Sequence, residues 1–392
     1  MSAPIRVITC AGGAPWEAPL VRGLQRPELG VELVRRCVDH GELLGVAVRD
    51  QARVAVIAAS LPWLDRDLVG TLHDHGVTVV AVGADDRPLD RVGVAHRLPE
   101  GATADDLAGL VHRIGGGERS PDAVEPSGDE SMPAPGRMIA VWGAPGAPGR
   151  TTVAVHLAVE AARSGVGVAL VDGDAWSASV AQLLGLDEAP SIAQAARLAG
   201  EGWRQPIESC FQEGPAGCAV LAGLARAELW PEVRERAWTA VLDAARNGRD
   251  VVIVDLAAPI EEDEELAFDR VPHRRNLMTL TALAAADEVL VVTSADPVGI
   301  RRGIVAHRTL TEARPAVAPR ARVLLNRMPR SARRAQECSA QVSEWTGRPP
   351  AALLPSEPQL ARTVWEARAL HEIVPRSPWL RELRSLVPVM AR

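Results

Sequence analysis

The pattern of apolar and polar positions over residues 1–115 predicts a small α/β domain. Short apolar runs typical of buried strands lie at Ile5–Thr9, Val31–Val34, Ala52–Ala58, Val77–Val82 and, more weakly, Val92–Leu98. Helix-compatible segments separate these runs, near Trp16–Gln25, His40–Val48, Leu64–His75 and Thr103–Ile114. Strands that alternate with helices are typical of a doubly wound, mostly parallel sheet. We therefore predict such a domain over residues 1–115.

The composition changes sharply after this domain. Residues 115–136 read GGGERSPDAVEPSGDESMPAPG, a stretch rich in Gly, Pro, Ser and acidic residues that has almost no apolar side chains. Such a segment cannot bury enough surface to offset the entropy lost on ordering. We therefore predict a flexible linker over residues 116–136 and a second domain over residues 137–392.

Limited proteolysis tests this boundary. We expect the first cuts to fall between Gly115 and Gly136 and to leave two stable fragments, because a segment without a packed core is open to proteases. Fragment masses read by mass spectrometry give the cut sites. Primary cuts elsewhere, with this stretch protected, would show that the boundary is wrong.

A strand, a glycine-rich loop and a helix open the second domain. The apolar run Ile139–Trp142 suits a buried strand, and the loop Gly143–Gly149 follows it. Residues 150–152, Arg-Thr-Thr, then begin a helical stretch that ends near Gly165. Backbone N–H groups of small residues and a helix N-terminus favour an anion, while a Thr hydroxyl there can ligate Mg²⁺. The layout predicts a phosphate-binding loop; a plain strand-to-helix turn is the alternative.

Acidic residues follow two buried strands of the second domain. Asp172 and Asp174 come directly after the run Val166–Val171, and Asp255 closes the run Asp250–Val254. The carboxyl ends of parallel strands face the ligand crevice of a doubly wound sheet. A carboxylate at a strand end can instead cap the next helix. With Thr151 expected at the same edge, the set predicts a magnesium site.

The rest of the second domain alternates in the same way, which predicts a second doubly wound, mostly parallel sheet. Further strands are expected at Cys218–Leu221, Glu288–Val292, Arg322–Asn326 and Ala351–Leu354. Further helices are expected at Ser191–Ala199, Pro231–Asn247, Asn276–Ala285, Pro297–Ala313, Ser331–Thr346 and Gln359–Ala367.

Charge and composition narrow the function classes. The net charge of −7 argues against DNA as a partner. No apolar run reaches the roughly 20 residues that a membrane span needs, and the N-terminus lacks a signal-peptide pattern, so we expect a cytoplasmic protein. The five cysteines form no C-x-x-C pair, which favours reduced buried thiols over a zinc site. The sequence has no lysine, so all 43 basic residues are arginine.

From Met138 onward the order of motifs resembles the MinD/ParA-type P-loop ATPases, the deviant Walker A family. The family's loop KGGxGKTT aligns with PGAPGRTT at residues 145–152. VDGD at 171–174 matches the end of its switch I strand, and VVIVD at 251–255 matches its Walker B strand. LLNR at 324–327 and LPSEPQLARTVWEARAL at 354–370 resemble its two adenine-side segments. The resemblance covers roughly 250 residues and implies a P-loop NTPase fold that uses ATP and Mg²⁺.

The resemblance also implies roles for individual residues. Nucleotide contacts are implied for Gly146, Ala147, Pro148, Gly149, Arg150, Thr151, Thr152, Asn326 and Pro355, the last two on the adenine. Mg²⁺ contacts, direct or through water, are implied for Thr151, Asp172 and Asp255. Arg150 and Asp174 would be the catalytic residues, because Arg150 stands for the P-loop lysine and Asp174 would orient the attacking water.

Two departures from the family loop put hydrolysis in question. Pro145 stands where the family has the signature lysine that reaches the phosphates of a partner subunit, and Arg150 stands where it has the second lysine. A cation at the transferring phosphate is a main source of transition-state stabilisation in such enzymes. The sequence therefore leaves open an ATPase that hydrolyses weakly, an ATP-dependent homodimer, and a nucleotide-binding scaffold that does not hydrolyse.

The first domain resembles a response-regulator receiver domain in topology. A working receiver needs acidic residues after its first strand and an acceptor Asp after its third, where this chain has Cys10-Ala11 and Ala58-Ala59. We therefore expect a degenerate receiver-like, flavodoxin-like domain, with an unrelated small α/β domain as the alternative. A degenerate receiver followed by a linker and this ATPase resembles the TadZ/CpaE branch, which positions pilus-assembly machinery.

The resemblance implies a spatial organiser in septum-site selection, chromosome partitioning or pilus positioning, with proteins of that machinery as partners. A DNA-binding partition protein is an alternative, supported by the run Arg320, Arg322, Arg327, Arg330, Arg333 and Arg334. An amidoligase-type relative would need an acid-binding pocket that the sequence does not reveal. The apolar face of Pro378–Val387 could make a weak peripheral contact with the inner face of the plasma membrane, although a helix packed on the domain is the favoured reading.

Overall fold

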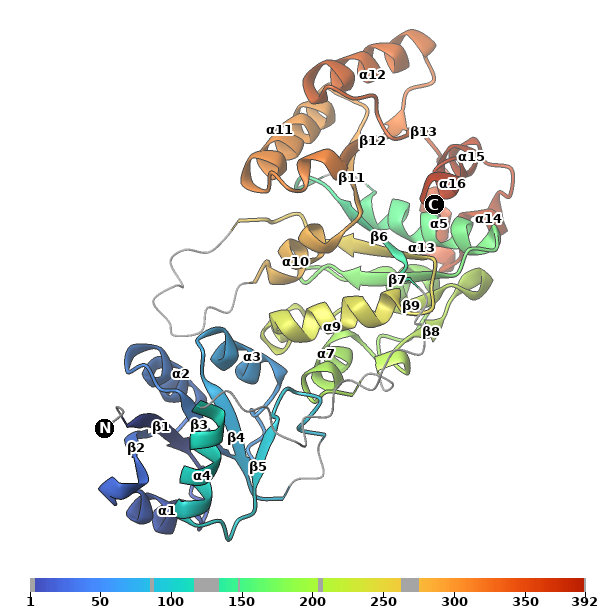
Figure 1. Ribbon diagram of the computed structural model, residues 1–392. Coiled ribbons are helices and arrows are strands. Elements are labelled where there is room, and N and C mark those ends of the chain that lie inside the picture. Colours follow the sequence, from blue (N-terminus) through green and yellow to red (C-terminus); the bar gives the residue numbers. More distant parts are fainter. Residues whose placement is uncertain are drawn as a thin grey trace. The chain divides into compact units, whose positions relative to one another are not determined.

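Figure 1 shows the computed structural model of the chain, which describes residues 4–84, 88–115, 134–146, 149–203, 207–261 and 275–390. The chain divides into two compact units, one comprising Met1–Met132 with Leu198–Trp203 and the other beginning at Pro133. Each unit is built on its own sheet. The linker predicted over residues 116–136 lies for the most part outside the described residues, and so do the predicted site residues Ala147 and Pro148.

The first unit is a five-stranded parallel sheet with helices on both faces, as the sequence pattern predicts. Its elements in chain order are β1 Ile5–Cys10, α1 Glu17–Leu24, β2 Val31–Arg36, α2 His40–Arg49, β3 Val54–Ala58, α3 Arg66–Asp74, β4 Thr78–Val82, β5 His96–Leu98 and α4 Ala104–Gly115. The strand order β2-β1-β3-β4-β5 is the flavodoxin-like order. The flavodoxin-like fold expected for this unit is therefore confirmed.

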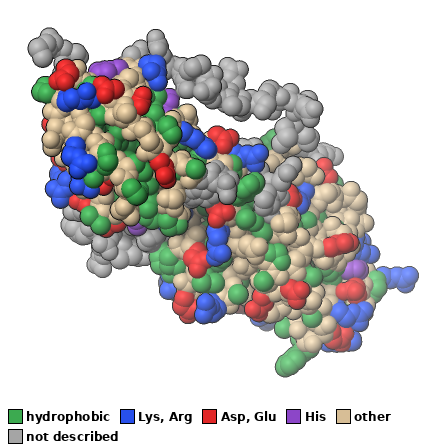
Figure 2. Space-filling view, turned by 90° about the horizontal axis from the view of Figure 1, so that it is seen from below, with side chains coloured by type: hydrophobic (Ala, Val, Ile, Leu, Met, Phe, Trp, Pro, Cys, Tyr) green, Lys and Arg blue, Asp and Glu red, His purple; other side chains and the backbone are tan. Residues whose placement is uncertain are grey.

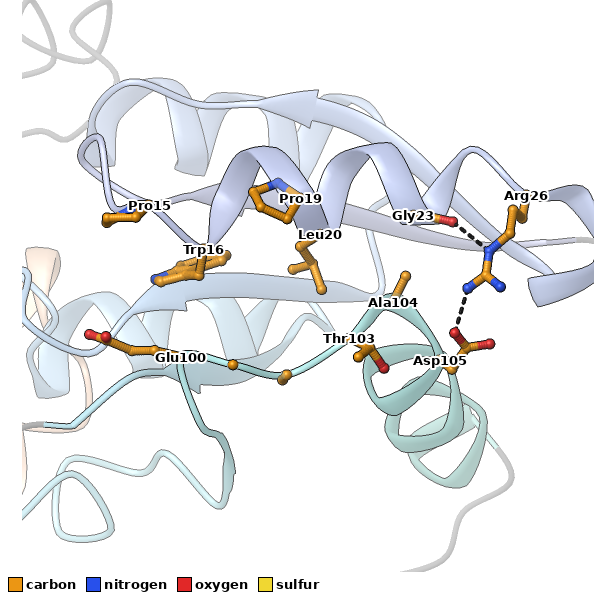
Figure 3. Close-up of a pocket in the computed structure, with 12 residues that line it drawn as sticks. Pro15, Trp16, Pro19, Leu20, Gly23, Arg26, Glu100, Thr103, Ala104 and Asp105 are labelled. Atoms are coloured by element: carbon orange, nitrogen blue, oxygen red, sulfur yellow. Dashed lines mark hydrogen bonds and ion pairs between the residues drawn. The ribbon is translucent and has the colours of Figure 1, made fainter.

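Alternating side chains of the central strands supply both halves of this unit's core. Val54 and Val56 of β3 pack with α1 and α4, whereas Ala55 and Ile57 pack with α2 and α3. A strand buried on both faces reads as a continuous apolar run, which is why VAVIA is wholly buried. Figure 3 shows the groove between α1 and α4, with a volume of about 540 Å³.

The strand ends of the first unit carry no acidic side chain where a receiver would need one. Cys10 ends β1 and Ala58 ends β3, and both are buried. The nearby buried carboxylate of Glu17 accepts hydrogen bonds from Thr9 Oγ1 at 2.7 Å and from Arg36 Nη2 at 2.6 Å. Glu17 is therefore committed to binding α1 to β1 and β2.

The second unit is an eight-stranded sheet in the order β13-β12-β11-β6-β10-β7-β9-β8, with β8 antiparallel and every other pairing parallel. Its strands are β6 Arg137–Trp142, β7 Val168–Gly173, β8 Gln212–Glu213, β9 Ala219–Leu221, β10 Val251–Leu256, β11 Glu288–Ser294, β12 Ala321–Met328 and β13 Leu353–Pro355. Its helices are α5 Arg150–Arg163, α6 Val180–Leu184, α7 Ile192–Gly200, α9 Glu235–Arg246, α10 Leu277–Ala285, α11 Pro297–Ala313, α12 Ala332–Thr346, α13 Leu360–Glu366, α14 Leu370–Ile373, α15 Pro378–Arg384 and α16 Val387–Met390. The second predicted sheet is confirmed.

One predicted helix begins later than expected. The sequence pattern gives a helix over Pro231–Asn247, but α9 starts at Glu235 because residues Ala227–Glu232 form a 3₁₀ helix that contains Pro231. A proline inside an α-helix lacks an N–H donor and clashes with the preceding turn. The short antiparallel strand β8 was not predicted, since two residues carry no periodicity.

The C-terminal segment packs on the second unit, which was the favoured alternative. Trp379, Leu380 and Leu383 of α15 are buried in one cluster with Val153 and Leu157 of α5. The side chains that would face lipid are therefore those that face α5. No helix in the described part of the chain is long and apolar enough to cross a membrane.

Candidate nucleotide-binding site

The phosphate loop joins β6 to α5, and two of its glycines have left-handed backbones. Gly146 has φ 74° and Gly149 has φ 94°, a region that side chains other than glycine rarely adopt. A Cβ on Gly149 would lie 2.5 Å from Asn326 Nδ2, so a side chain at this position would collide with β12. Gly149 is the N-cap of α5, and no side chain in the described part of the chain caps that helix. The first-turn N–H groups, which an anion would satisfy, therefore have no side-chain acceptor.

The basic residue of the loop lies across it. Arg150 Nη1 donates to the carbonyl oxygen of Gly143 at 3.2 Å, and its Nη2 lies 4.0 Å from Asp174 Oδ2. The Arg150 side chain is 18% exposed, so part of the guanidinium faces solvent at the loop. The structure thus brings the two predicted catalytic residues together, with a donor surface left for a phosphate.

The two carboxylates after β7 also fold the loop that follows them. Asp172 Oδ2 accepts from the N–H groups of Ser179 at 2.8 Å and Val180 at 2.9 Å, at the start of α6. Burial raises the pKa of Asp172 to about 6. Asp174 Oδ1 accepts from the N–H groups of Trp176 and Ser177. The helix-capping alternative is therefore correct for Asp172, and it coexists with a position at the site.

Asp255 differs from these two because part of its carboxylate has no protein partner. Asp255 pairs in register with Asp172 on β7 and Val141 on β6, which places it directly beside the loop. It is 1% exposed, and among the described residues its Oδ1 has no hydrogen-bond donor. Burial, and then the charge of Asp172, raise the pKa of Asp255 well above the usual range, against a hydrogen bond with Thr151 that lowers it.

These residues fit a magnesium ion that phosphate and water help to hold. No group of three or more His, Cys, Asp or Glu side chains in the described part of the chain could hold a metal by itself. Mg²⁺ in nucleotide sites is bound by one or two carboxylates together with phosphate oxygens and waters. The orphaned oxygen of Asp255 beside Thr151 supplies the kind of acceptor that such a hydrated ion requires.

The two predicted adenine-side residues lie on neighbouring strands. Asn326 is on β12, and Pro355 on β13 is paired with Met328 two residues further along β12. Asn326 Oδ1 accepts from Trp379 Nε1 at 3.1 Å and from the N–H of Arg327 at 2.9 Å. The Asn326 oxygen is thus engaged by protein donors, and its amide nitrogen packs on Gly149. Adenine recognition by Asn326 and Pro355 stays a prediction.

Sequence reasoning missed a set of buried polar contacts on α5, the helix that follows the loop. It is formed by Trp379, His156, the carbonyl of Thr152 and the N–H of Leu370, and is called the brace below. Trp379 is fully buried and meets His156 of α5 edge to face, at 5.4 Å between ring centroids. His156 Nδ1 lies 2.8 Å from the carbonyl oxygen of Thr152, and its Nε2 accepts from the N–H of Leu370 at 3.1 Å. Two polar residues one turn apart in a largely apolar helix, His156 and Glu160, are the sequence signal that could have revealed this brace.

The brace predicts a pH dependence of stability. Burial lowers the pKa of His156 from 6.5 to about 4, against the contact with the Thr152 carbonyl and the charge of Glu160, which raise it. The unprotonated Nε2 accepts from the N–H of Leu370. Between these two pH values the unfolded chain binds a proton at this histidine and the folded chain does not. The free energy of unfolding therefore decreases as the pH falls from about 6.5 to about 4. The shift corresponds to about 3 kcal/mol over that window.

The variant His156→Gln isolates this effect, since a Gln oxygen can accept from Leu370 but does not titrate. Urea unfolding of both proteins at several pH values gives the difference in their unfolding free energies. We expect the wild type to lose its advantage over the variant as the pH falls. Other titrating groups cancel in the difference, so a difference independent of pH would contradict the assignment.

Comparisons with known proteins agree with this geometry. No protein-family model matches the chain. The chain is 28% identical to the antiactivator FleN of Pseudomonas aeruginosa over 252 residues, which are 62% of the chain and 82% of FleN. It is 28% identical over 156 residues to an uncharacterized ATP-binding protein of Methanocaldococcus jannaschii, covering 40% of the chain and about half, 52%, of that relative.

Solved structures show the same fold. A ParA family ATPase from Chlorobium tepidum matches 64% of the chain and 98% of its own length, with a TM-score of 0.54 and 18% identity. The septum site-determining protein MinD of Pyrococcus horikoshii, in complex with Mg-ADP, matches 64% of the chain and 94% of its own length, with a TM-score of 0.50 and 20% identity. The second unit of the chain therefore has the fold of the MinD and ParA P-loop ATPases.

Proposed function

We propose that the second unit binds ATP with Mg²⁺ and hydrolyses it slowly, and that the nucleotide state controls a spatial organiser. The observation that carries the proposal is the convergence at one sheet edge of an uncapped helix N-terminus, Arg150 and Asp174, with Asp255 beside Thr151. A phosphate anion would bind the helix N-terminus and Arg150, and a divalent cation would bind near Thr151 and Asp255.

Each residue has a separate task in this proposal. The N–H groups at the start of α5 and the Arg150 guanidinium bind the phosphates. Thr151 and Asp255 hold the hydrated Mg²⁺, which would neutralise charge on the phosphate oxygens when bound. Asp174, held by the N–H groups of Trp176 and Ser177, keeps one oxygen toward Arg150 and orients the attacking water. Asp172 supports this edge through the first turn of α6.

The organising role is supported by the relatives rather than by the site. FleN is an antiactivator and the Pyrococcus horikoshii relative is a septum site-determining protein. We propose that this chain acts in the same general way, in septum-site selection, chromosome partitioning or pilus positioning, as an ATP-dependent homodimer with proteins of that machinery. Its first unit would be a receiver-derived domain that takes no phosphoryl group, as in the TadZ/CpaE branch.

DNA binding receives less support from the arginine-rich run. Arg320 donates to the carbonyl oxygens of Ala284 and Ala286, Arg322 pairs with Glu288 and Arg333 pairs with Glu337. Acidic and basic side chains are interspersed over the face shown in Figure 2. A phosphate backbone requires unpaired cations gathered on one surface.

A scaffold that binds ATP without hydrolysing it is the second candidate. Pro145 carries no charge, and part of the Arg150 guanidinium is engaged by Gly143. Both features reduce the positive charge available to a transition state, although neither prevents ground-state binding.

Titration of ATP with and without Mg²⁺, together with phosphate release, tests the proposal. The wild type should bind ATP and release phosphate slowly. Asp174→Ala should bind almost unchanged and release none, whereas Asp255→Ala should lose the Mg²⁺ dependence of binding more than affinity itself. Binding without phosphate release by the wild type would favour the scaffold. No measurable affinity at millimolar ATP would refute nucleotide binding by this unit.

A further inference from the structure

An arginine to which the sequence assigned no role lies against the phosphate loop. Arg302 belongs to the second turn of α11, and its Nη1 would lie 3.0 Å from a Cβ built on Gly146. Gly146 follows Pro145, the position at which the chain lacks a lysine. The guanidinium of Arg302 therefore stands beside the stretch of loop that has lost its cation.

Arg302 has acidic neighbours but no ion-pair partner in the described part of the chain. Its side chain is exposed, and Glu261 lines the cavity that Arg302 also lines. Its charge acts on Asp296, and that carboxylate already accepts from Ser294 Oγ and from the N–H groups of Val298 and Gly299. A cation beside a phosphate loop without a partner retains its donors for a ligand.

The arginine opens onto a cavity at the mouth of the loop. This cavity has a volume of about 880 Å³ and is lined by Ala144 and Pro145 of the loop, Ala258 and Glu261 after β10, and Arg301 and Arg302 of α11. Glu261 accepts from the N–H of Ile260. The loop, the segment that follows Asp255 and α11 therefore enclose one volume, with two arginines on one wall.

The fold fixes the position of Arg302 firmly. Gly299 and Gly303 let α11 approach β11 closely, since a Cβ on Gly299 would lie 2.4 Å from the carbonyl oxygen of Ser294 and one on Gly303 would lie 2.7 Å from Thr293 Cγ2. Thr293 Oγ1 also donates to the carbonyl oxygen of Gly299 at 2.6 Å. Because β11 is paired with β6, which leads into the loop, α11 and the loop share one rigid support.

We infer that Arg302 supplies the terminal phosphate of the bound nucleotide with the positive charge that Pro145 cannot supply, and does so from within the same chain. The inference rests on the proposed function. A guanidinium offers two parallel N–H donors to a phosphate and remains charged at every physiological pH. Its effect is largest on the terminal phosphate, so Arg302 distinguishes a nucleoside triphosphate from a diphosphate.

The test compares triphosphate and diphosphate affinity in the full chain. A non-hydrolysable ATP analogue and ADP are titrated with Mg²⁺ into the wild type, Arg302→Ala and Arg308→Ala by calorimetry. Arg302→Ala should weaken the triphosphate analogue about tenfold and ADP less than about twofold, which is the loss of one charge-assisted contact. Arg308→Ala is the matched control and should leave both affinities unchanged, because Arg308 is an exposed arginine of the same helix that does not line the cavity.

The outcomes separate this inference from the proposed function. Wild-type affinity without selective loss in Arg302→Ala leaves nucleotide binding intact and overturns the role of Arg302. Equal weakening of both nucleotides also overturns it, since it would show only a loosened loop. If the wild type binds neither nucleotide, both proposals fall. Arg302→Gln, which removes the charge but keeps a polar side chain and its first methylene groups, should show the same selective loss, and unchanged thermal melting confirms that each variant is folded.

Discussion

Replacing Arg150 by alanine is expected to weaken ATP binding by about tenfold to a hundredfold. Arg150 leads α5 beside Gly149, and its guanidinium has one contact to the Gly143 carbonyl and faces Asp174 at 4.0 Å. Charge-assisted hydrogen bonds to a phosphate contribute roughly 1.5–3 kcal/mol each, and 1.4 kcal/mol is a factor of ten. Calorimetric titration of ATP with Mg²⁺ measures the change.

Two variants complete this experiment. Arg150→Lys restores the residue of the P-loop pattern and should retain most of the affinity, because an ammonium can still reach an outer phosphate as a point charge. Arg333→Ala is the control, since its side chain is 88% exposed and pairs with Glu337 on α12. Wild-type affinity in Arg150→Ala would mean that the loop binds phosphate through its backbone alone or does not bind it.

Replacing Trp379 by alanine should lower the free energy of unfolding of the second unit by about 3–5 kcal/mol, as for other buried tryptophans. Trp379 is fully buried, fills the space between α15 and α5, and meets the His156 ring edge to face. The variant also removes the donor to Asn326 Oδ1, so a buried acceptor loses one partner. Urea unfolding measures the loss.

Trp365→Ala is the matched control, because Trp365 is the same residue type and is 90% exposed on α13. Its unfolding free energy should stay within about 0.5 kcal/mol of the wild type. Trp379 also donates to Asn326, whose amide nitrogen packs on Gly149 of the loop, so Trp379→Ala should weaken ATP binding as well. A variant as stable as the wild type would mean that α15 is not packed on α5 in solution.

The strands and most helices of both units follow from local pattern alone. A buried parallel strand needs a run of apolar side chains, and a capping residue before a proline favours a helix start, so Asp296 and Pro297 mark the start of α11 where the sequence predicts it. The glycine-rich loop between a strand and a helix could likewise be predicted. Gly146 and Gly149 have left-handed backbones, which glycine adopts readily and other residues rarely do. The residues that end β1 and β3 of the first unit, Cys10 and Ala58, lie at or close to the strand ends that the sequence predicts.

Local pattern fails where the outcome depends on partners distant in the chain. The apolar periodicity predicted one long helix where a 3₁₀ helix with Pro231 precedes α9, and it did not predict the two-residue strand β8. The sequence left open whether the apolar face of α15 contacts lipid or protein. The structure shows that this face packs on α5. The sequence left open whether Asp172 contacts a metal or caps a helix. In the structure it accepts from the N–H of Val180 and caps α6.

By itself the sequence determined the two α/β sheets, the phosphate loop and the acidic strand ends, because these depend on residues close together in the chain. Tertiary structure alone decided which strands are neighbours, and with them the pairing that sets Asp255 beside Asp172. It also decided that Asn326 packs on Gly149 and that Arg302 reaches the loop from α11. These contacts join residues more than 80 positions apart in the chain, and strand order and helix packing, which no local periodicity encodes, bring them together.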